Sequence, residues 1–275
     1  MISPKTVSIV IPIYNDYKYI HGCLEAISKQ VDMPNEVIVV DNNCTDNSVK
    51  IAKSYKFVKV ITEKSQGLSP ARNRGFNSAK GDILVRIDAD TQLPPDYVQK
   101  LKALFNSDYN GAATGYGVSR YEFLPRTSIF WNKVYHAYVE SFLGHKVLYG
   151  ANTVLLKNDW LKVKNIVIND DGAVHEDQDL SLALASVGVG VKIFPELTVS
   201  IDTSSLQTYK KFQLYLQVMH NTKKIDLSHP RSKYNTRLKT SSNYRRFLLW
   251  LVSFWAIYLY YFLVIVRDFY LRLRR

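Results

Sequence analysis

The chain has 275 residues, of which 47% are hydrophobic and 22% are charged, so it can bury a full core and is not a disordered tail. The net charge is +12, but residues 1–208 carry 22 basic and 22 acidic residues, and the excess therefore lies in residues 209–275. Because no nucleic-acid-binding module is visible, we interpret this basic end as membrane-binding and expect no nucleic-acid partner. Cys23 and Cys44 lie in no metal-binding or redox pattern and are expected to be free thiols.

The first half of the chain alternates β-branched runs with amphipathic stretches. Strands are predicted at residues 7–13, 36–40, 57–61 and 83–87, and helices at residues 17–30, 46–55, 70–79 and 95–106. This alternation is typical of an α/β fold with a mostly parallel central sheet flanked by helices. In the third helix, Ser69 is expected to cap the N-terminus and Pro70 to take the first helical position.

Beyond residue 110 the spacing of apolar residues is less regular. A strand is expected at residues 151–156, a helix after Glu176 and Asp177, a strand at residues 191–194 and a basic amphipathic helix over residues 206–224. The predicted organisation is a main domain (1–208), a basic amphipathic helix and linker (209–246), a membrane helix (247–266) and a basic tail (267–275).

The segment 247–266 is twenty residues without a charge. As a helix it would be roughly 30 Å long, which matches one bilayer crossing, and arginines flank it on both sides. The alternative is a very apolar core helix at the end of a soluble domain. A helix of a soluble protein normally keeps a polar face, however, and this segment offers only Ser253 and tyrosine hydroxyls. The first residues show no signal-peptide pattern, so we expect a cytoplasmic main domain with a single C-terminal anchor, while a re-entrant hairpin stays open.

Polar residues follow the predicted strands where each one ends. Asp41 comes after the second strand, and Asp88 and Asp90 come after the fourth, in the run ILVRIDADTQLP. Ligands of an open parallel sheet bind at the carboxyl ends of its strands. Two carboxylates one residue apart can point toward one place and suit a divalent cation that also needs phosphate oxygens. An Asp-rich turn or helix cap before Pro94 and Pro95 is the alternative.

Five blocks of sequence together carry a resemblance to a known family. They are VSIVIPIYN, VIVVDNNCTDNS, GLSPARNRGF, GDILVRIDADT and HEDQDLSLAL. In order and spacing they resemble the family 2 glycosyltransferases of the GT-A fold, over roughly residues 6–200. The resemblance implies a nucleotide-binding catalytic domain, a Mn²⁺ or Mg²⁺ cofactor, and direct displacement with inversion at the anomeric carbon.

The resemblance also implies roles for individual residues. The donor site would comprise Pro12 and Tyr14 at the nucleotide, Asp41 at the base, Gly67, Arg72 and Asn73 near the nucleotide and donor sugar, Asp88 at the ribose or sugar, and Asp90 at the metal, with Asp88 as a second metal candidate. Asp177, with Glu176 before it, matches the pair of acids that supplies the general base. Gly150 and Asn152 match an acceptor-side segment.

Each of these residues also has a plain structural interpretation. Asp41 could cap a turn, and Arg72 could be a solvated helical charge. Glu176 and Asp177 could be first-turn acids favoured by the helix dipole. Gly150 and Asn152 could form an ordinary turn.

The family resemblance predicts a metal-dependent, inverting enzyme that moves one sugar from a nucleotide-sugar, with UDP as the expected nucleotide. The chain lacks the Q/RxxRW motif and the several membrane helices of polymer-extruding members, so a single transfer is expected. A membrane anchor favours a lipid-linked or glycolipid acceptor, as in cell-envelope glycan or polysaccharide synthesis, because confinement raises the effective acceptor concentration. The alternative is a membrane-tethered, inactive binding protein of the same fold.

Overall fold

The computed structural model describes residues 4–107, 109–120 and 125–202, together with residues 217, 218, 220–222, 224, 225, 251, 255, 259 and 262. Its strands are β1 (Val7–Ile13), β2 (Glu36–Asp41), β3 (Val58–Thr62), β4 (Ile83–Arg86), β5 (Ala112–Thr114), β6 (Gly117–Ser119), β7 (Thr153–Leu156), β8 (Val191–Ile193) and β9 (Val199–Ile201). Its helices are α1 (Ile20–Ser28), α2 (Ser48–Lys53), α3 (Leu68–Ser78), α4 (Tyr97–Asn106), α5 (Pro125–Leu143), α6 (Lys157–Val163), α7 (Glu176–Ser186) and a short 3₁₀ helix, η1 (Pro195–Leu197).

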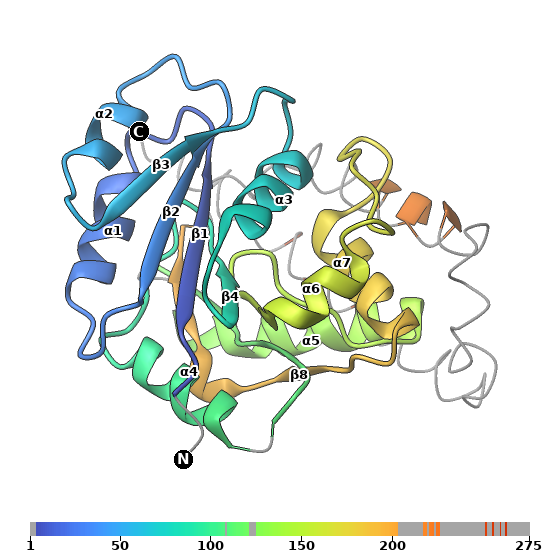
Figure 1. Cartoon of the computed structure of the whole chain (residues 1–275). Helices are drawn as coiled ribbons and strands as arrows, with labels where there is room; N and C mark the ends of the chain where they lie inside the picture. Colours follow the sequence, from blue (N-terminus) through green and yellow to red (C-terminus); the bar gives the residue numbers. More distant parts are fainter. Residues whose placement is uncertain are drawn as a thin grey trace, which may run out of the picture.

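The main sheet has the strand order β3-β2-β1-β4-β7-β5-β8 (Figure 1). Strands β3, β2, β1 and β4 are parallel to one another, as is the pair β5 and β8. Strand β7 is antiparallel to both of its neighbours, β4 and β5. The prediction of an α/β fold with a mostly parallel central sheet is confirmed. The parallel part brings the carboxyl ends of β1, β2 and β4 to one edge.

Helices cover both faces of the main sheet, with α1, α2 and α4 on one face and α3, α6 and α7 on the other (Figure 1). Side chains of β1 alternate between the two layers, since Ile9 packs in the cluster of α1 and α4 and Val10 in the cluster of α3. Gly75 lets α3 approach β1 closely, because a Cβ there would lie 2.2 Å from Cγ1 of Val10. Helix α3 therefore packs closely against β1.

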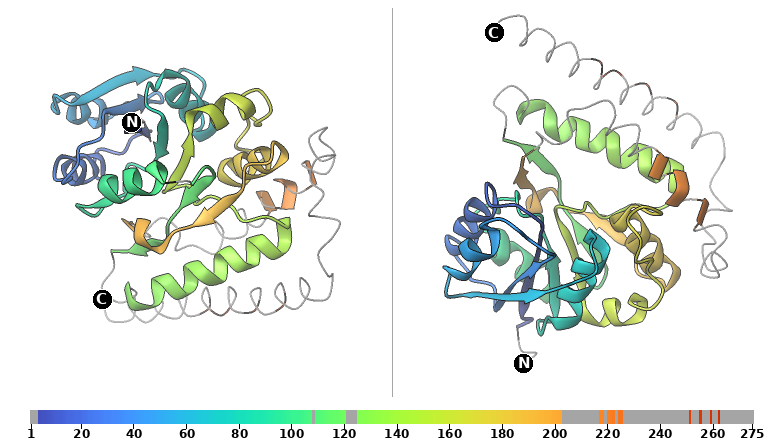
Figure 2. Two further views of the ribbon diagram at one scale, coloured as in Figure 1. Left: turned by 60° about the horizontal axis from the view of Figure 1, so that its bottom comes forward. Right: turned by 90° about the horizontal axis from the view of Figure 1, so that it is seen from above.

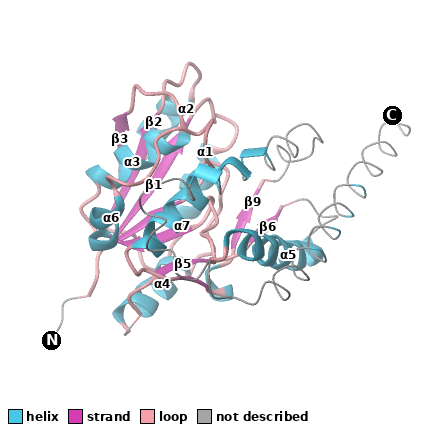
Figure 3. Cartoon of the chain, turned by 90° about the vertical axis from the view of Figure 1, so that its right-hand side faces the viewer, coloured by secondary structure: helices cyan, strands magenta, loops and turns pink. Residues whose placement is uncertain are grey.

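Helix α5 and a small parallel sheet of β6 and β9 lie outside these three layers (Figure 2). Figure 3 shows α5 beside β6, and Tyr138, Val139 and Leu143 of α5 form a separate apolar cluster with Val147 and Leu182. Strand β6 and helix α5 follow β5 in the chain, whereas β9 comes after β8 and η1. Strand β9 brings Asp202 back to the edge of the main sheet.

The third helix begins two residues earlier than predicted. It starts at Leu68 with Gly67 as its N-cap residue, so Ser69 and Pro70 lie inside the first turn. The cap comes from a distant residue, because the carboxylate of Asp171 accepts hydrogen bonds from the N–H groups of Leu68 and Ser69 and from the Ser69 hydroxyl. The prediction that Ser69 caps this helix is therefore wrong.

The predicted helix and linker (209–246), membrane helix (247–266) and basic tail (267–275) lie outside the described residues, apart from eleven positions that are helical. Among the residues that the structure describes, no helix is both long and apolar enough to cross a membrane. The C-terminal part of the predicted organisation therefore stays a prediction.

Candidate functional site

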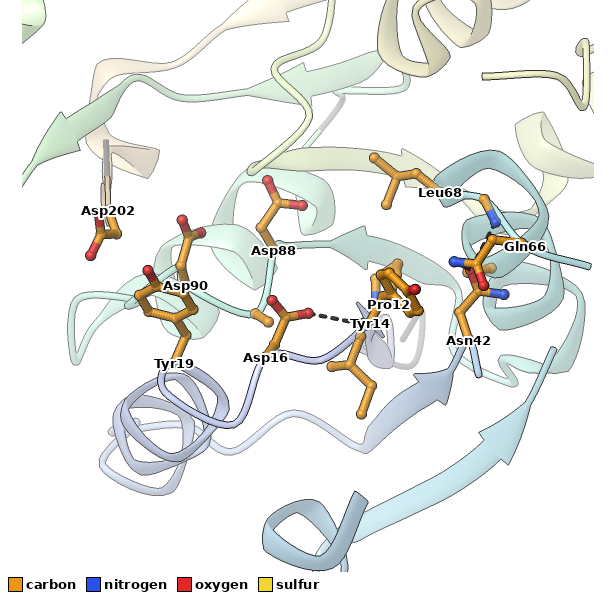
Figure 4. A pocket seen from close by; sticks show the side chains of 14 residues that line it. Pro12, Tyr14, Asp16, Tyr19, Asn42, Gln66, Leu68, Asp88, Asp90 and Asp202 are labelled. Carbon is orange, nitrogen blue, oxygen red and sulfur yellow. Dashed lines mark hydrogen bonds between the residues drawn. The ribbon is translucent and has the colours of Figure 1, made fainter. Parts of the chain in front are cut away.

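A cavity of about 390 Å³ opens at the carboxyl ends of β1, β2 and β4. Its wall includes five of the predicted site residues, namely Pro12, Tyr14, Gly67, Asp88 and Asp90. It also includes residues that the sequence analysis did not assign, among them Asp16, Tyr19, Asn42, Gln66 and Asp202. Figure 4 shows the acidic side chains gathered at one side of this cavity and Asn42, Gln66 and Leu68 at the other.

The acidic side of the cavity is formed by Asp16, Asp88, Asp90 and Asp202 (Figure 4). Burial, together with the charges of Asp88, Asp202 and Asp16, raises the pKa of Asp90 to about 7, although Arg120 acts in the opposite direction. Burial likewise raises the pKa of Asp16, and the charge of Asp88 adds to the effect. The described wall of the cavity carries four carboxyl groups and no lysine or arginine.

This acidic wall fits a divalent cation at Asp88 and Asp90. Hard cations prefer carboxylate oxygens, and a bound cation would offset both the burial and the neighbouring negative charges that raise the pKa of Asp90. Within the described ranges, no group of three or more His, Cys, Asp or Glu side chains is placed to hold a metal ion. Asp90 and Asp88 would thus hold the ion with few protein ligands, which leaves positions for water and for diphosphate oxygens.

The opposite end of the cavity is organised by Asn42, which is buried. Its amide nitrogen donates to the carbonyl oxygens of Glu63 and Ser65 at 3.0 and 2.7 Å, and its Oδ1 accepts from the N–H of Gly67 at 2.8 Å. Asp41 does not line the cavity, and its Oδ1 accepts a hydrogen bond from the Cys44 N–H at 2.9 Å. The structure thus places Asn42, and not Asp41, in the cavity wall, and Asp41 makes the turn contact that was the alternative interpretation.

Gly67 needs the conformational freedom of glycine. Its φ angle is +142°, and a Cβ at this position would lie 2.7 Å from a carboxylate oxygen of Asp171 and 3.1 Å from Cδ of Pro70. Any side chain at position 67 would therefore collide with Asp171 or Pro70 at the N-terminus of α3. Tyr14, on the other side, is 54% exposed at the rim.

Behind the cavity lies a buried group of charges. Arg72 on α3 contacts Glu176 on α7, with 2.5 Å from Nη1 to Oε2 and 2.7 Å to the Glu176 carbonyl oxygen. Its Nε and Nη2 donate to Oδ1 of Asn73 at 3.0 and 2.9 Å. Arg86 at the end of β4 contacts Glu176 Oε1 at 3.0 Å and Asp88 Oδ1 at 2.5 Å. Arg72 and Asn73 are therefore placed in this charge group and not in the cavity wall.

Glu176 and Asp177 have opposite electrostatic environments although they are adjacent. Arg86 and Arg72 lower the pKa of Glu176 in spite of its burial, so it stays ionised. Burial and the charge of Glu176 raise the pKa of Asp177 to about 6. Asp177 Oδ1 accepts the Gln178 N–H at 2.7 Å, and its Oδ2 accepts the Gly150 N–H at 3.2 Å. A fixed carboxylate with a raised pKa is suited to accept a proton near neutral pH.

The two predicted acceptor-side residues have different surroundings. Gly150 touches the charge group, because its N–H binds Asp177 and a Cβ there would lie 2.7 Å from Nη1 of Arg86. Asn152 is fully buried, and its side chain accepts from the Tyr97 hydroxyl at 2.5 Å and donates to the Leu197 carbonyl at 2.6 Å. Gly150 thus adjoins Asp177, whereas Asn152 is a core residue with its side chain closed off from the cavity.

Solved structures share this architecture at low sequence identity. A mannosyltransferase from Pyrobaculum calidifontis, solved with GDP-Man and Mn²⁺, superposes with a TM-score of 0.65 and 20% identity over 93% of this chain and 75% of that one. Glucosyl-3-phosphoglycerate synthase from Mycobacterium tuberculosis, solved with Mn²⁺, UDP and glucosyl-3-phosphoglycerate, gives 0.57 and 18% over 79% of this chain and 78% of that one. The fold is therefore that of a GT-A-like domain.

Sequence comparison gives the family. The profile described as glycosyl transferase family 2 matches residues 8–156, more than half of the chain, and glycosyl transferase family group 2 matches residues 83–271. The chain belongs to glycosyl transferase family 2. Among curated relatives, an undecaprenyl-phosphate 4-deoxy-4-formamido-L-arabinose transferase from Serratia proteamaculans is 32% identical over 119 residues. That match covers 40% of this chain and only about a third, 36%, of the relative's length.

Proposed function

We propose that the chain is an inverting glycosyltransferase that moves one sugar from a nucleotide-sugar, with UDP as the nucleotide, to a lipid-linked acceptor. One observation carries this proposal above the others. Two pairs of acids, Asp88 with Asp90 and Glu176 with Asp177, come from distant parts of the chain, and Arg86 contacts both pairs. Asp88 and Asp90 line the cavity, and Glu176 and Asp177 lie next to this contact without lining the cavity. One pair suits the donor diphosphate and its cation, and the other suits proton removal from an acceptor.

Asp177 acts as the general base. An acceptor hydroxyl must lose its proton as its oxygen attacks the anomeric carbon, and a carboxylate within hydrogen-bond reach takes that proton. Both oxygens of Glu176 are held by arginines, Oε2 by Arg72 and Oε1 by Arg86, so Glu176 is poorly placed to accept a proton. The N–H groups of Gly150 and Gln178 hold the Asp177 carboxylate in place.

Asp90 and Asp88 act on the donor, where the nucleoside diphosphate leaves. When bound there, Mn²⁺ or Mg²⁺ supplies a positive charge that stabilises the departing nucleoside diphosphate. Both solved structures described above contain Mn²⁺, which supports a divalent cation in this fold. Asp88 and Asp90 orient the donor side of the cavity, while Gly67 and Tyr14 lie where the nucleotide would pass.

A membrane lipid phosphate is the proposed acceptor class. A curated relative is named as an undecaprenyl-phosphate transferase, and this chain ends in the uncharged segment 247–266 between basic residues. A main domain held at the cytoplasmic face of a membrane would meet a lipid-linked acceptor at high local concentration. Strong preference of the detergent-solubilised protein for free sugars over lipid-linked ones would contradict this acceptor class.

The alternative, an inactive binding protein of the same fold, is less favoured because both acid pairs are present and Arg86 contacts one member of each, Asp88 and Glu176. The two are separated by measuring release of nucleoside diphosphate from UDP- and GDP-sugars by purified protein with Mn²⁺, with Asp90→Ala as the control. We expect Mn²⁺-dependent release from one donor and loss of that release in Asp90→Ala. Binding of a donor without any release, with membrane lipids present, would favour the inactive binding protein.

A further inference from the structure

Arg86 is a buried cation at the end of a central strand. Its side chain is 1% exposed, and its predecessors in β4, from Ile83 to Val85, are apolar. Nη2 lies 2.5 Å from Oδ1 of Asp88, and Nη1 lies 3.0 Å from Oε1 of Glu176. We propose that Arg86 is a positioning residue that sets the placement of the donor-side acids relative to the acids that carry the base. This inference rests on the proposed function.

Among the residues that the structure describes, Arg86 alone forms ion pairs with both acid pairs. The other buried arginine, Arg72, contacts Glu176 at its carboxylate and carbonyl oxygens, and its remaining nitrogens are bound by Asn73. Arg72 therefore holds Glu176 on α7 against α3, whereas Arg86 joins Glu176 to Asp88. A shift of the Arg86 guanidinium would therefore change the position of Asp88, on the donor side, relative to Glu176 and its neighbour Asp177, the proposed base.

Gly150 leaves room for this bridge. A Cβ on Gly150 would lie 2.7 Å from Nη1 of Arg86, 3.2 Å from Oε1 of Glu176 and 3.4 Å from Oδ2 of Asp177. The N–H of the same residue binds Asp177 Oδ2 at 3.2 Å. The backbone of Gly150 thus contacts the Arg86 guanidinium and binds the Asp177 carboxylate. A side chain at position 150 would collide with the guanidinium.

The contacts of Arg86 are better explained by placement than by stability. A buried ion pair is often no more stabilising than well-packed apolar side chains, and apolar residues fill the rest of β4. Within the described ranges, none of the three guanidinium nitrogens of Arg86 makes an aligned hydrogen bond, so its partners are held through charge at short range. A guanidinium offers two nitrogens in a rigid plane, which can contact two carboxylates at once, while a lysine ammonium is a single point.

The test compares Arg86→Lys with Arg72→Lys in the full-length protein. Lysine keeps the positive charge, so a change in Arg86→Lys reports the loss of the two-point bridge. We expect Arg86→Lys to bind Mn²⁺, measured by electron paramagnetic resonance without donor, about 10-fold more weakly, as outer contacts to metal ligands typically tune affinity. We expect kcat for transfer to fall by about 10² because the reacting groups are misplaced.

Arg72→Lys is the matched control, since Arg72 contacts Glu176 but not Asp88. It should lower kcat and leave Mn²⁺ affinity at the parent value, and exposed Arg74→Lys on the same helix should change neither. Should Arg86→Lys fail to fold, Gly150→Ala displaces the guanidinium from the other side and should weaken Mn²⁺ binding in the same way.

Parent-like Mn²⁺ affinity and kcat in Arg86→Lys would overturn the proposal. Equal loss of Mn²⁺ affinity in Arg86→Lys and Arg72→Lys would overturn it too, because the effect would then not depend on the contact with Asp88. A parent protein that binds Mn²⁺ but releases no nucleotide from any donor would contradict the proposed function alone. The comparison of Mn²⁺ affinities would still decide the role of Arg86.

Discussion

Asp177 is the residue whose surroundings are most informative about chemistry. An isolated aspartate titrates near pH 4, where it is too weak a base to help at neutral pH. Burial and the neighbouring charge of Glu176 raise the pKa of Asp177 to about 6, while His175 and Arg86 act in the opposite direction. Glu176 stays ionised because Arg86 and Arg72 lower its pKa. These adjacent carboxyl groups thus differ in pKa because Glu176, unlike Asp177, forms ion pairs with two arginines.

The raised pKa of Asp177 gives a prediction for the pH dependence of transfer. A general base works only when deprotonated, so kcat/KM should fall about tenfold per pH unit as the pH drops below about 6 and level off above it. The measurement is kcat/KM for transfer across this range, with an Mn²⁺ concentration that saturates the protein at each pH. An acid limb near pH 4, the range of an ordinary aspartate, would contradict the assignment of Asp177 as the base.

Individual site residues were predictable from sequence where strand geometry places them. Asp88 and Asp90 follow β4, which is parallel to β1, so their position at the carboxyl end of the parallel strands follows from the sheet. Asp202 lines the same cavity but directly follows β9, and no local sequence pattern predicts that β9 returns to this edge of the sheet. Arg86 was visible as a lone charge in an apolar strand, but its partner Glu176 is 90 positions away, so its role depends on tertiary structure.

At the scale of elements, the start of α3 couples two parts of the site. The backbone N–H groups at this end are bound by Asp171, which lies in the segment that leads to α7 and Asp177. Asn73 and Asn169 make a further contact between the same two segments, at 3.3 Å. Hydrogen bonds therefore connect the start of α3, next to Gly67, with the segment that precedes α7.

Removal of this distant cap should cost measurable stability. We expect Asp171→Ala to lower the free energy of unfolding by about 1–2 kcal/mol, as loss of a helix cap typically does, when measured by urea denaturation of the purified protein. Asp96→Ala is the matched control. Asp96 precedes α4 without a capping hydrogen bond and forms only an exposed ion pair with Lys100, so its loss should cost less than about 0.5 kcal/mol. Equal losses in the two variants would mean that Asp171 does not act as a cap.

The elements found from sequence are those with long, continuous patterns. Strands β1 to β4 were predicted to within about one residue at each end, because buried parallel strands appear as unbroken β-branched runs. Strands β5, β6 and β9 have three residues each, too few to show a periodicity, and helices α5 and α6 were not predicted. Strand β7 was predicted, but its antiparallel direction is set by tertiary pairing with β4 and β5.

At the scale of the whole molecule, charge and apolar residues are divided along the chain. Residues 1–208 are balanced in charge, and the basic excess surrounds the segment 247–266. Of this segment the structure describes Leu251, Trp255, Leu259 and Phe262, and the last three are 65%, 54% and 61% exposed. That the segment 247–266 spans a membrane stays a prediction.

A single membrane crossing predicts a protected tail. Protease added to sealed vesicles with the cytoplasmic face outward should degrade the main domain and leave a tag after residues 267–275 intact. Opening the vesicles with detergent should make the tag cleavable, which is the control for its accessibility. Cleavage of the tag in sealed vesicles would contradict a single span and favour a re-entrant or surface-bound segment.

The most direct test of the central claim, that the two acid pairs divide donor binding and proton removal between them, compares Asp177→Asn with Asp90→Ala in one experiment. Transfer to a lipid-linked acceptor and Mn²⁺-dependent donor affinity are measured for both variants and for the parent. We expect Asp177→Asn to lose about 10²–10⁴-fold in transfer while it binds donor like the parent, and Asp90→Ala to lose both. Transfer by Asp177→Asn at the parent rate, or unchanged Mn²⁺-dependent donor affinity in Asp90→Ala, would contradict this division of roles.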